Sequence, residues 1–105
     1  RYSHAAVIEG PGKRLVISGQ VGITADGVIP PGGEAQIAQA LQNVATVLAA
    51  NRMTPANIVK LGIFLTDAAL IPVWRAERAK VFGTLTPTST LLIVAGLADP
   101  RYVFE

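Results

Sequence analysis

Cysteine is absent from the 105 residues, histidine occurs once, and aromatic residues make up only 6% of the chain. Without a thiol the chain has no disulfide, no cysteine nucleophile and no cysteine-ligated zinc. The single histidine, His4, has no second ligand at metal-binding spacing and no nucleophile paired with it in sequence. We therefore expect no metal and no cofactor. A cysteine-free chain also fits a reducing compartment, so we expect a cytoplasmic protein.

Long hydrophobic runs and a dominant charge are also missing. No apolar stretch approaches the roughly 20 residues that a membrane-spanning helix needs. The opening residues Arg1–His4 lack the pattern of a secretory signal peptide. Nine basic residues stand against seven acidic ones, and they are scattered rather than gathered into a phosphate-binding stripe. We expect neither a membrane nor nucleic acid as a partner.

Apolar residues, by contrast, make up half of the chain. A chain of this length and composition suits a single domain with its own core, without staples from metals or disulfides. The last residues, 103–105, resemble the start of a strand that stops abruptly. We expect one domain over residues 1–105 whose C-terminal strand is truncated.

Two segments have the spacing of amphipathic helices. In residues 34–52, Ile37, Leu41, Val44 and Leu48 recur every three or four positions and predict a helix with one apolar face. Pro72 suits the first turn of a second helix over residues 72–82, and Gly83 is a suitable stop.

Strands are predicted where apolar residues alternate or run together between turns. Gly10–Gly12 and Ala25–Gly27 read as turns. In residues 59–66, Leu61, Ile63 and Leu65 point to one face. The run Leu91–Val94 is apolar on both faces and predicts a buried strand. The predicted strands cover residues 3–9, 14–18, 28–29, 59–66, 88–95 and 101–105.

This order of elements predicts an α+β fold with two helices packed on one face of a sheet. Two helices cannot cover both faces, yet Leu15–Ile17 and Leu91–Val94 are apolar on both. A second copy of the chain is the simplest cover for the remaining face, so we expect a homo-oligomer.

Several segments in order resemble one known family. The matching segments are Tyr2-Ser3-His4-Ala5, Ile17-Ser18-Gly19-Gln20-Val21-Gly22, Glu34-Ala35-Gln36 with Ala40-Leu41-Gln42-Asn43-Val44, Val59-Lys60 with Ile63-Phe64-Leu65-Thr66-Asp67, and Leu97-Ala98-Asp99-Pro100 with Val103-Phe104-Glu105. Together they resemble the Rid (YjgF/UK114, RidA-like) family, whose members were once labelled translation inhibitors or L-PSP endoribonucleases.

The resemblance implies a chorismate-mutase-like fold: a six-stranded mixed sheet with two helices on one face, assembled as a homotrimeric barrel. Small-molecule clefts are expected between the subunits. The best-known members hydrolyse reactive enamines and imines such as 2-aminoacrylate, giving ammonia and a 2-keto acid.

The same resemblance suggests site residues. Glu105 matches the family carboxylate that handles water, and Tyr2 and Ser18 match positions that line the pocket. Trp74 lies near a family asparagine that this chain lacks. Ser89 stands where imine deaminases carry an arginine for the substrate carboxylate. Serine offers a neutral hydrogen bond of about 1 kcal/mol against about 1.5–3 kcal/mol for one to a charged group, so an efficient 2-aminoacrylate deaminase is not expected.

Structural roles compete with these functional ones. Ser18 can serve a backbone bend, and Trp74 can pack helix against sheet. Arg75 and Arg78 share a flank of the second helix, where they can be solvated or reach a neighbouring subunit's pocket. Three function classes stay open: a hydrolase or deaminase acting on C=N bonds, a non-catalytic metabolite-binding protein, and a ribonuclease. The last is disfavoured because no histidine pair, carboxylate cluster or basic stripe is present.

Overall fold

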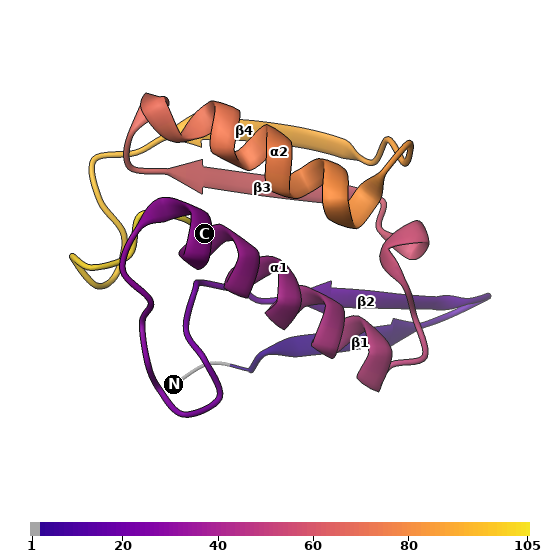
Figure 1. The fold of residues 1–105 in the computed structure, drawn as a ribbon. Helices are drawn as coiled ribbons and strands as arrows, with labels where there is room; N and C mark the ends of the chain where they lie inside the picture. The colour runs from indigo at the N-terminus through magenta and orange to yellow at the C-terminus, as the bar shows by residue number, and fades with distance from the viewer. Residues whose placement is uncertain (1–2) are drawn as a thin grey trace.

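The structure, a computed structural model, describes residues 3–105 and has mixed α+β architecture. Within these residues the two longer helices and the strands follow the chain in the order shown in Figure 1. They are β1 (Ala5–Glu9), β2 (Lys13–Ile17), α1 (Gly33–Ala50), β3 (Lys60–Leu65), α2 (Ile71–Phe82) and β4 (Thr88–Ile93). Short 3-10 helices at Pro55–Asn57 and Ala68–Leu70 precede β3 and α2. The predicted α+β class is confirmed.

Helix α1 buries the face that its apolar spacing predicts. Ile37, Leu41 and Leu48 are all buried. The chain enters the helix through Gly32, whose φ of 90° lies in the left-handed region that favours glycine. Glu34 occupies the first turn, near the positive end of the helix dipole. The helix ends at Ala50, two residues before the predicted boundary.

Helix α2 agrees closely with its prediction. It begins at Ile71, with Pro72 in the first turn, where a missing N–H costs nothing. It ends before Gly83, which has a φ of 54° and whose N–H donates to the carbonyl of Ala79. Trp74 and Phe82 are buried on the side that faces the sheet and α1.

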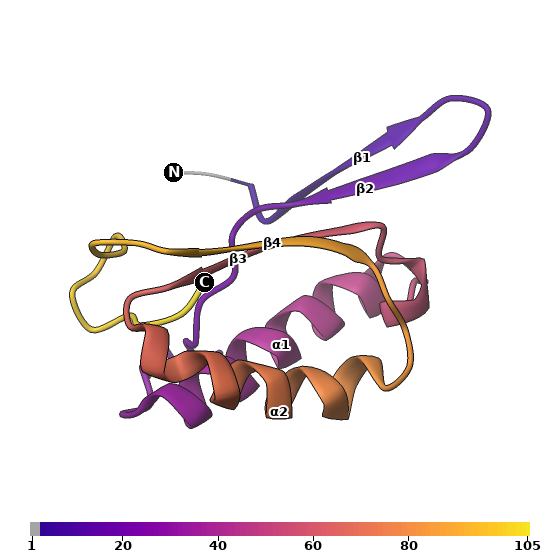
Figure 2. The ribbon, with the colours of Figure 1, turned by 90° about the horizontal axis from the view of Figure 1, so that it is seen from above.

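The strands form two separate two-stranded sheets. β1 and β2 make an antiparallel hairpin in which Ala5 lies opposite Ile17. β3 and β4 pair in parallel, with Lys60 opposite Thr88. Figure 2 shows both helices on one face of β3 and β4, and the hairpin projecting on the other side. The predicted packing of two helices on one face is confirmed.

The described residues do not form the expected six-stranded sheet, because β2 and β3 are not hydrogen-bonded to each other. The strand predicted at residues 101–105 is reduced to one bridge between Phe104 and Leu65. The strand predicted at Val28–Ile29 is wrong: these residues lie in a loop. Pro30 follows directly and has no N–H for a ladder, while Val28 closes a turn back to Thr24 instead.

The core lies between the two helices and β3, and it includes Ile37, Leu41, Ile63, Leu65, Trp74, Phe82 and Phe104. Other apolar strand residues are left outside it. They are 43–51% exposed and come from β1, β2 and β4: Val7, Ile8, Val16, Leu92 and Ile93. We call these five the exposed apolar strand residues. They agree with the expectation of an uncovered apolar sheet surface. Neither helix within residues 3–105 is long and apolar enough to cross a membrane.

Candidate functional site

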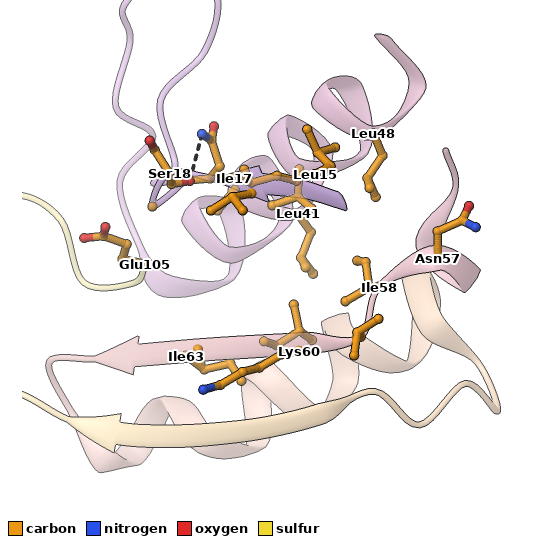
Figure 3. A pocket seen from close by; sticks show the side chains of 18 of the residues that line it. Leu15, Ile17, Ser18, Leu41, Leu48, Asn57, Ile58, Lys60, Ile63 and Glu105 are labelled. Carbon is orange, nitrogen blue, oxygen red and sulfur yellow. Dashed lines mark hydrogen bonds between the residues drawn. The ribbon is translucent and has the colours of Figure 1, made fainter. Parts of the chain in front are cut away.

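A groove of about 790 Å³ separates the hairpin from β3. Figure 3 shows its walls: Leu15 and Ile17 come from β2, and Leu41 and Leu48 come from α1. Lys60 and Ile63 of β3 form the opposite side. Ser18 and Glu105 lie at one end of this largely apolar space. Three of the predicted site residues, Ser18, Trp74 and Glu105, therefore line the same groove.

Glu105 is fixed by its backbone and lies against a glycine. Its N–H donates to the carbonyl of Phe64 at 2.9 Å, and its carbonyl accepts from the Phe64 N–H at 2.8 Å. Its carboxylate occupies the space where a Cβ on residue 19 would lie. Any side chain at Gly19 would displace that carboxylate. The Ser18–Gln20 segment and the end of the chain thus form one structural unit.

Helix α1 holds the loop that follows Gly19. The amide of Asn43 donates to the carbonyls of Val21, at 3.0 Å, and Ile23, at 2.9 Å. Gly22 packs so closely on the helix that an added Cβ would lie 2.5 Å from the Cα of Gln36. The resemblance had included Asn43 and Gly22 in matching segments without assigning them a role, and the structure gives both a positioning role.

Gln36 holds the C-terminal segment against α1. Its side chain is buried, and its amide nitrogen donates to the carbonyls of Pro30, at 3.1 Å, and Arg101, at 2.9 Å. Its side-chain oxygen accepts from the Val103 N–H at 3.0 Å. All of its polar atoms are used by backbone groups, so Gln36 supports the site indirectly by placing the approach to Glu105.

A charged turn precedes the same segment. Arg101 donates to Asp99 through its guanidinium, at 2.7 and 3.0 Å, and through its backbone N–H, at 2.8 Å. The guanidinium first, and the backbone N–H second, lower the pKa of Asp99 to about 2. The ionised carboxylate therefore helps to define the turn that leads to Phe104.

Ser18 uses its hydroxyl within the chain. The Oγ donates to the carbonyl of Ser3, and the Ser18 N–H donates to the carbonyl of His4 at 2.7 Å. Its own carbonyl accepts from the side chain of Gln20, the dashed bond in Figure 3. These contacts favour the structural alternative for Ser18. Its ligand-binding role stays a prediction.

Trp74 is buried and packs against Phe104, with the ring centroids 5.5 Å apart. This is the helix-to-sheet packing that the sequence allowed as an alternative. Trp74 nevertheless lines two cavities: the groove of Glu105 and a second space beside α2. Its role toward a ligand stays a prediction.

Ser89 does not line the groove of Glu105. It lies on β4 at the second cavity, of about 390 Å³, which it shares with Trp74, Arg75 and Arg78. The two arginines were expected on a solvated helix flank or near a neighbour's pocket, and here they border a cavity of their own chain. The helical spacing could predict that they share a flank, but not that β4 lies opposite.

Two further predictions concern Tyr2 and metal binding. Tyr2 lies outside the described residues, so its predicted place in the cleft is untested. Among residues 3–105, no group of three histidine, cysteine, aspartate or glutamate side chains is placed to hold a metal ion.

The whole chain, residues 1–105, matches the family described as Endoribonuclease L-PSP. It is also 33% identical to Protein HMF1 of Saccharomyces cerevisiae (strain ATCC 204508 / S288c) over 97 residues, covering 91% of this chain and 73% of the yeast protein. The chain belongs to this family, which is also called Rid or YjgF/UK114. The resemblance that the sequence motifs suggested is confirmed.

Solved Rid structures share the fold. RidA from the Antarctic bacterium Psychrobacter sp. PAMC 21119 superposes with a TM-score of 0.90 at 24% identity, covering 98% of this chain and 81% of that one. E. coli TdcF with bound serine gives a TM-score of 0.87 at 22% identity, covering 99% and 82%. At these identities the similarity shows the fold and no more.

Proposed function

We propose that this Rid protein forms a homotrimer whose clefts between subunits hold a small imine-, enamine- or amide-like metabolite. The trimer would complete the family's six-stranded mixed sheet and barrel, and it would cover the exposed apolar strand residues. We further propose that the protein is not an efficient 2-aminoacrylate deaminase. A cytoplasmic location is part of the proposal, since a cysteine-free chain fits a reducing compartment.

The observation that carries the substrate part of this proposal is Ser89. In Rid deaminases an arginine of this strand binds the substrate carboxylate, whereas here the position holds a hydroxyl that is exposed at a cavity. An arginine binds a carboxylate through two parallel, charge-assisted hydrogen bonds, and a serine offers one neutral bond. Substitution of one by the other weakens the hold on a carboxylate-bearing imine.

The position of Glu105 supports the part of the proposal that concerns hydrolysis. Hydrolysis of an imine needs a group that takes a proton from water as the water adds to the carbon. The Glu105 carboxylate lies at an end of an otherwise largely apolar groove, anchored by backbone bonds on β3. TdcF, a protein of the same fold, holds serine in its structure, which supports a small ligand of amino-acid size.

Ammonia release from imines made in place by an amino-acid oxidase tests this proposal. We expect slow release from 2-aminoacrylate and faster release from a preferred imine. Glu105→Gln should lower the preferred rate by at least about a hundredfold, the usual lower range for general-base catalysis. Unchanged activity in Glu105→Gln would remove Glu105 from the mechanism.

Restoring the missing charge is the complementary experiment. Ser89→Arg should raise kcat/KM for 2-aminoacrylate by about tenfold or more, because a charged bond replaces a neutral one. Ser89→Lys is the matched control, since it adds charge without the planar fork and should give a smaller gain.

The other function classes correspond to other outcomes. Rapid release from 2-aminoacrylate by the unaltered protein would indicate a genuine enamine deaminase. Ligand-induced thermal stabilisation without turnover would indicate a non-catalytic metabolite-binding protein. Salt-sensitive RNA binding with cleavage would revive the ribonuclease assignment.

A further inference from the structure

The second cavity has a composition unlike that of the groove. It lies between α2 and the β3–β4 sheet, and its lining combines four apolar residues with three polar ones: Ile63, Ile71, Trp74 and Leu91 with Arg75, Arg78 and Ser89. Its volume of about 390 Å³ falls within the usual range for small-molecule sites. Trp74 and Ile63 separate it from the groove of Glu105, since both line the two spaces.

The two arginines at this cavity both carry a positive charge, and they lie about one helical turn apart on α2. Among the ion pairs of residues 3–105, none involves Arg75 or Arg78. The next cation on the same helix, Lys80, is paired with the buried Glu77 at 2.7 Å. Like charges at this spacing repel each other and destabilise a helix. An anion bound between them would relieve that repulsion.

One of the guanidinium groups is already held in place. The Cζ of Arg78 lies 5.7 Å from the centroid of the Phe82 ring, within the range of a cation–π contact. Phe82 is itself part of the core. A guanidinium restrained in this way loses less conformational entropy when it binds an anion.

The neighbouring strand supplies the rest of the site. Leu91 lies opposite Ile63, and Ser89 lies opposite Leu61, in the parallel register of β4 and β3. The cavity therefore has apolar side chains from both strands and Ile71 from α2, with the Ser89 hydroxyl beside them. Such a surface suits a ligand that has a charged end and an apolar body.

We propose that this cavity binds a monocarboxylate with an aromatic or branched aliphatic body. The carboxylate lies at Arg75 and Arg78, with Ser89 as an added donor, and the body packs on Ile63, Ile71 and Leu91. The inference rests on the proposed small-molecule function and specifies a ligand class for Ser89. The Glu105 carboxylate lines the groove and not this cavity, so within one chain an acid held by Arg75 and Arg78 is not placed for hydrolysis at Glu105.

Calorimetric titration of the protein with phenylacetate tests this directly. Phenylacetamide is the neutral molecule of matched shape, and inorganic phosphate is an anion without an apolar body. Phenylacetate should bind at least about tenfold more tightly than either, because both the charge and the ring contribute. Equal binding of the amide, equal binding of phosphate, or no binding of phenylacetate would each overturn the proposal.

Single substitutions then locate the site. Arg75→Gln and Arg78→Gln should each weaken phenylacetate binding by about tenfold or more while the circular dichroism spectrum is unchanged. Arg52→Gln, which removes an exposed arginine away from the cavity, should bind like the unaltered protein. Binding that survives both cavity substitutions would place the acid elsewhere. Ammonia release that persists without acid binding would overturn this inference alone and leave the hydrolytic proposal standing.

Discussion

At the scale of single residues, the place of Glu105 depends on the missing side chain of Gly19. Gly19→Ala puts a methyl group where the carboxylate lies. The obstructed atoms are the far end of a flexible side chain, so we expect the carboxylate to move and the fold to survive. The proposed activity should fall by about tenfold or more, because a misplaced base transfers protons poorly. The measurement is kcat/KM for ammonia release, with the melting temperature alongside.

Gly96→Ala provides the matched control for that substitution. An added Cβ at Gly96 meets no atom within 4 Å, so neither activity nor stability should change appreciably. Full activity in Gly19→Ala would show that the position of the Glu105 carboxylate does not matter for the reaction.

Asp99 gives a prediction about acid stability. Its pKa is about 2 in the folded protein, below the 3.8 of an unperturbed aspartate. Because the folded-state pKa is the lower one, the carboxylate stabilises the fold above about pH 4, and this contribution is lost as the pH falls through about 2. Denaturant unfolding between pH 5 and 2 should show a smaller pH dependence for Asp99→Asn than for the unaltered protein. Identical curves would mean that the pair with Arg101 contributes nothing.

Only some of the residues that lie together in the structure could be grouped from the sequence. Ser18 and Glu105 line the same groove, because both lie in segments whose order and backbone pairing are fixed by the fold, and their predicted roles stay predictions. The association of Arg75 and Arg78 with Ser89 was not predicted. Periodicity assigns residues to a helix flank, but the strand that this flank faces is decided by tertiary packing.

At the scale of elements, both helices and the strands at β1, β2, β3 and β4 were predictable, whereas the strands expected at residues 28–29 and 101–105 were not. α1 was predictable from its repeated apolar spacing, and α2 from its initial proline and the glycine that follows it. Val28–Ile29 failed because two apolar residues beside Pro30 cannot sustain a ladder. The spacing of residues alone could not show which strands pair, since strand pairing depends on segments that are distant in the sequence.

The side chain of Gln36 links α1 to the C-terminal segment through hydrogen bonds to the backbone. Gln36→Leu would leave the carbonyls of Pro30 and Arg101 and the N–H of Val103 without their present partner. An unpaired group costs about 1–3 kcal/mol when it is buried, and these three are partly buried, so we expect a combined loss of about 3 kcal/mol in the free energy of unfolding. Chemical denaturation measures it, and Gln42→Leu on the exposed side of α1 is the control. A loss no larger than that of the control would contradict this role.

At the scale of the whole molecule, the hairpin and β4 leave apolar side chains without cover. Val7 and Leu15 pair across the hairpin on one face, and Val16 and Ala6 pair on the other. An isolated two-stranded hairpin is marginally stable in water, and exposed apolar surface of this kind marks an interface. Association of three copies would bury both the hairpin and Leu92 of β4, which is 49% exposed.

Sedimentation equilibrium is the most direct measurement of that association. The proposed homotrimer predicts a single species at three times the mass of one chain. It also predicts that Leu92→Lys shifts the distribution toward smaller species, whereas Val28→Lys, in a loop, does not. A stable, folded species with the mass of one chain at micromolar concentration would contradict the proposed trimer and, with it, the clefts between its subunits.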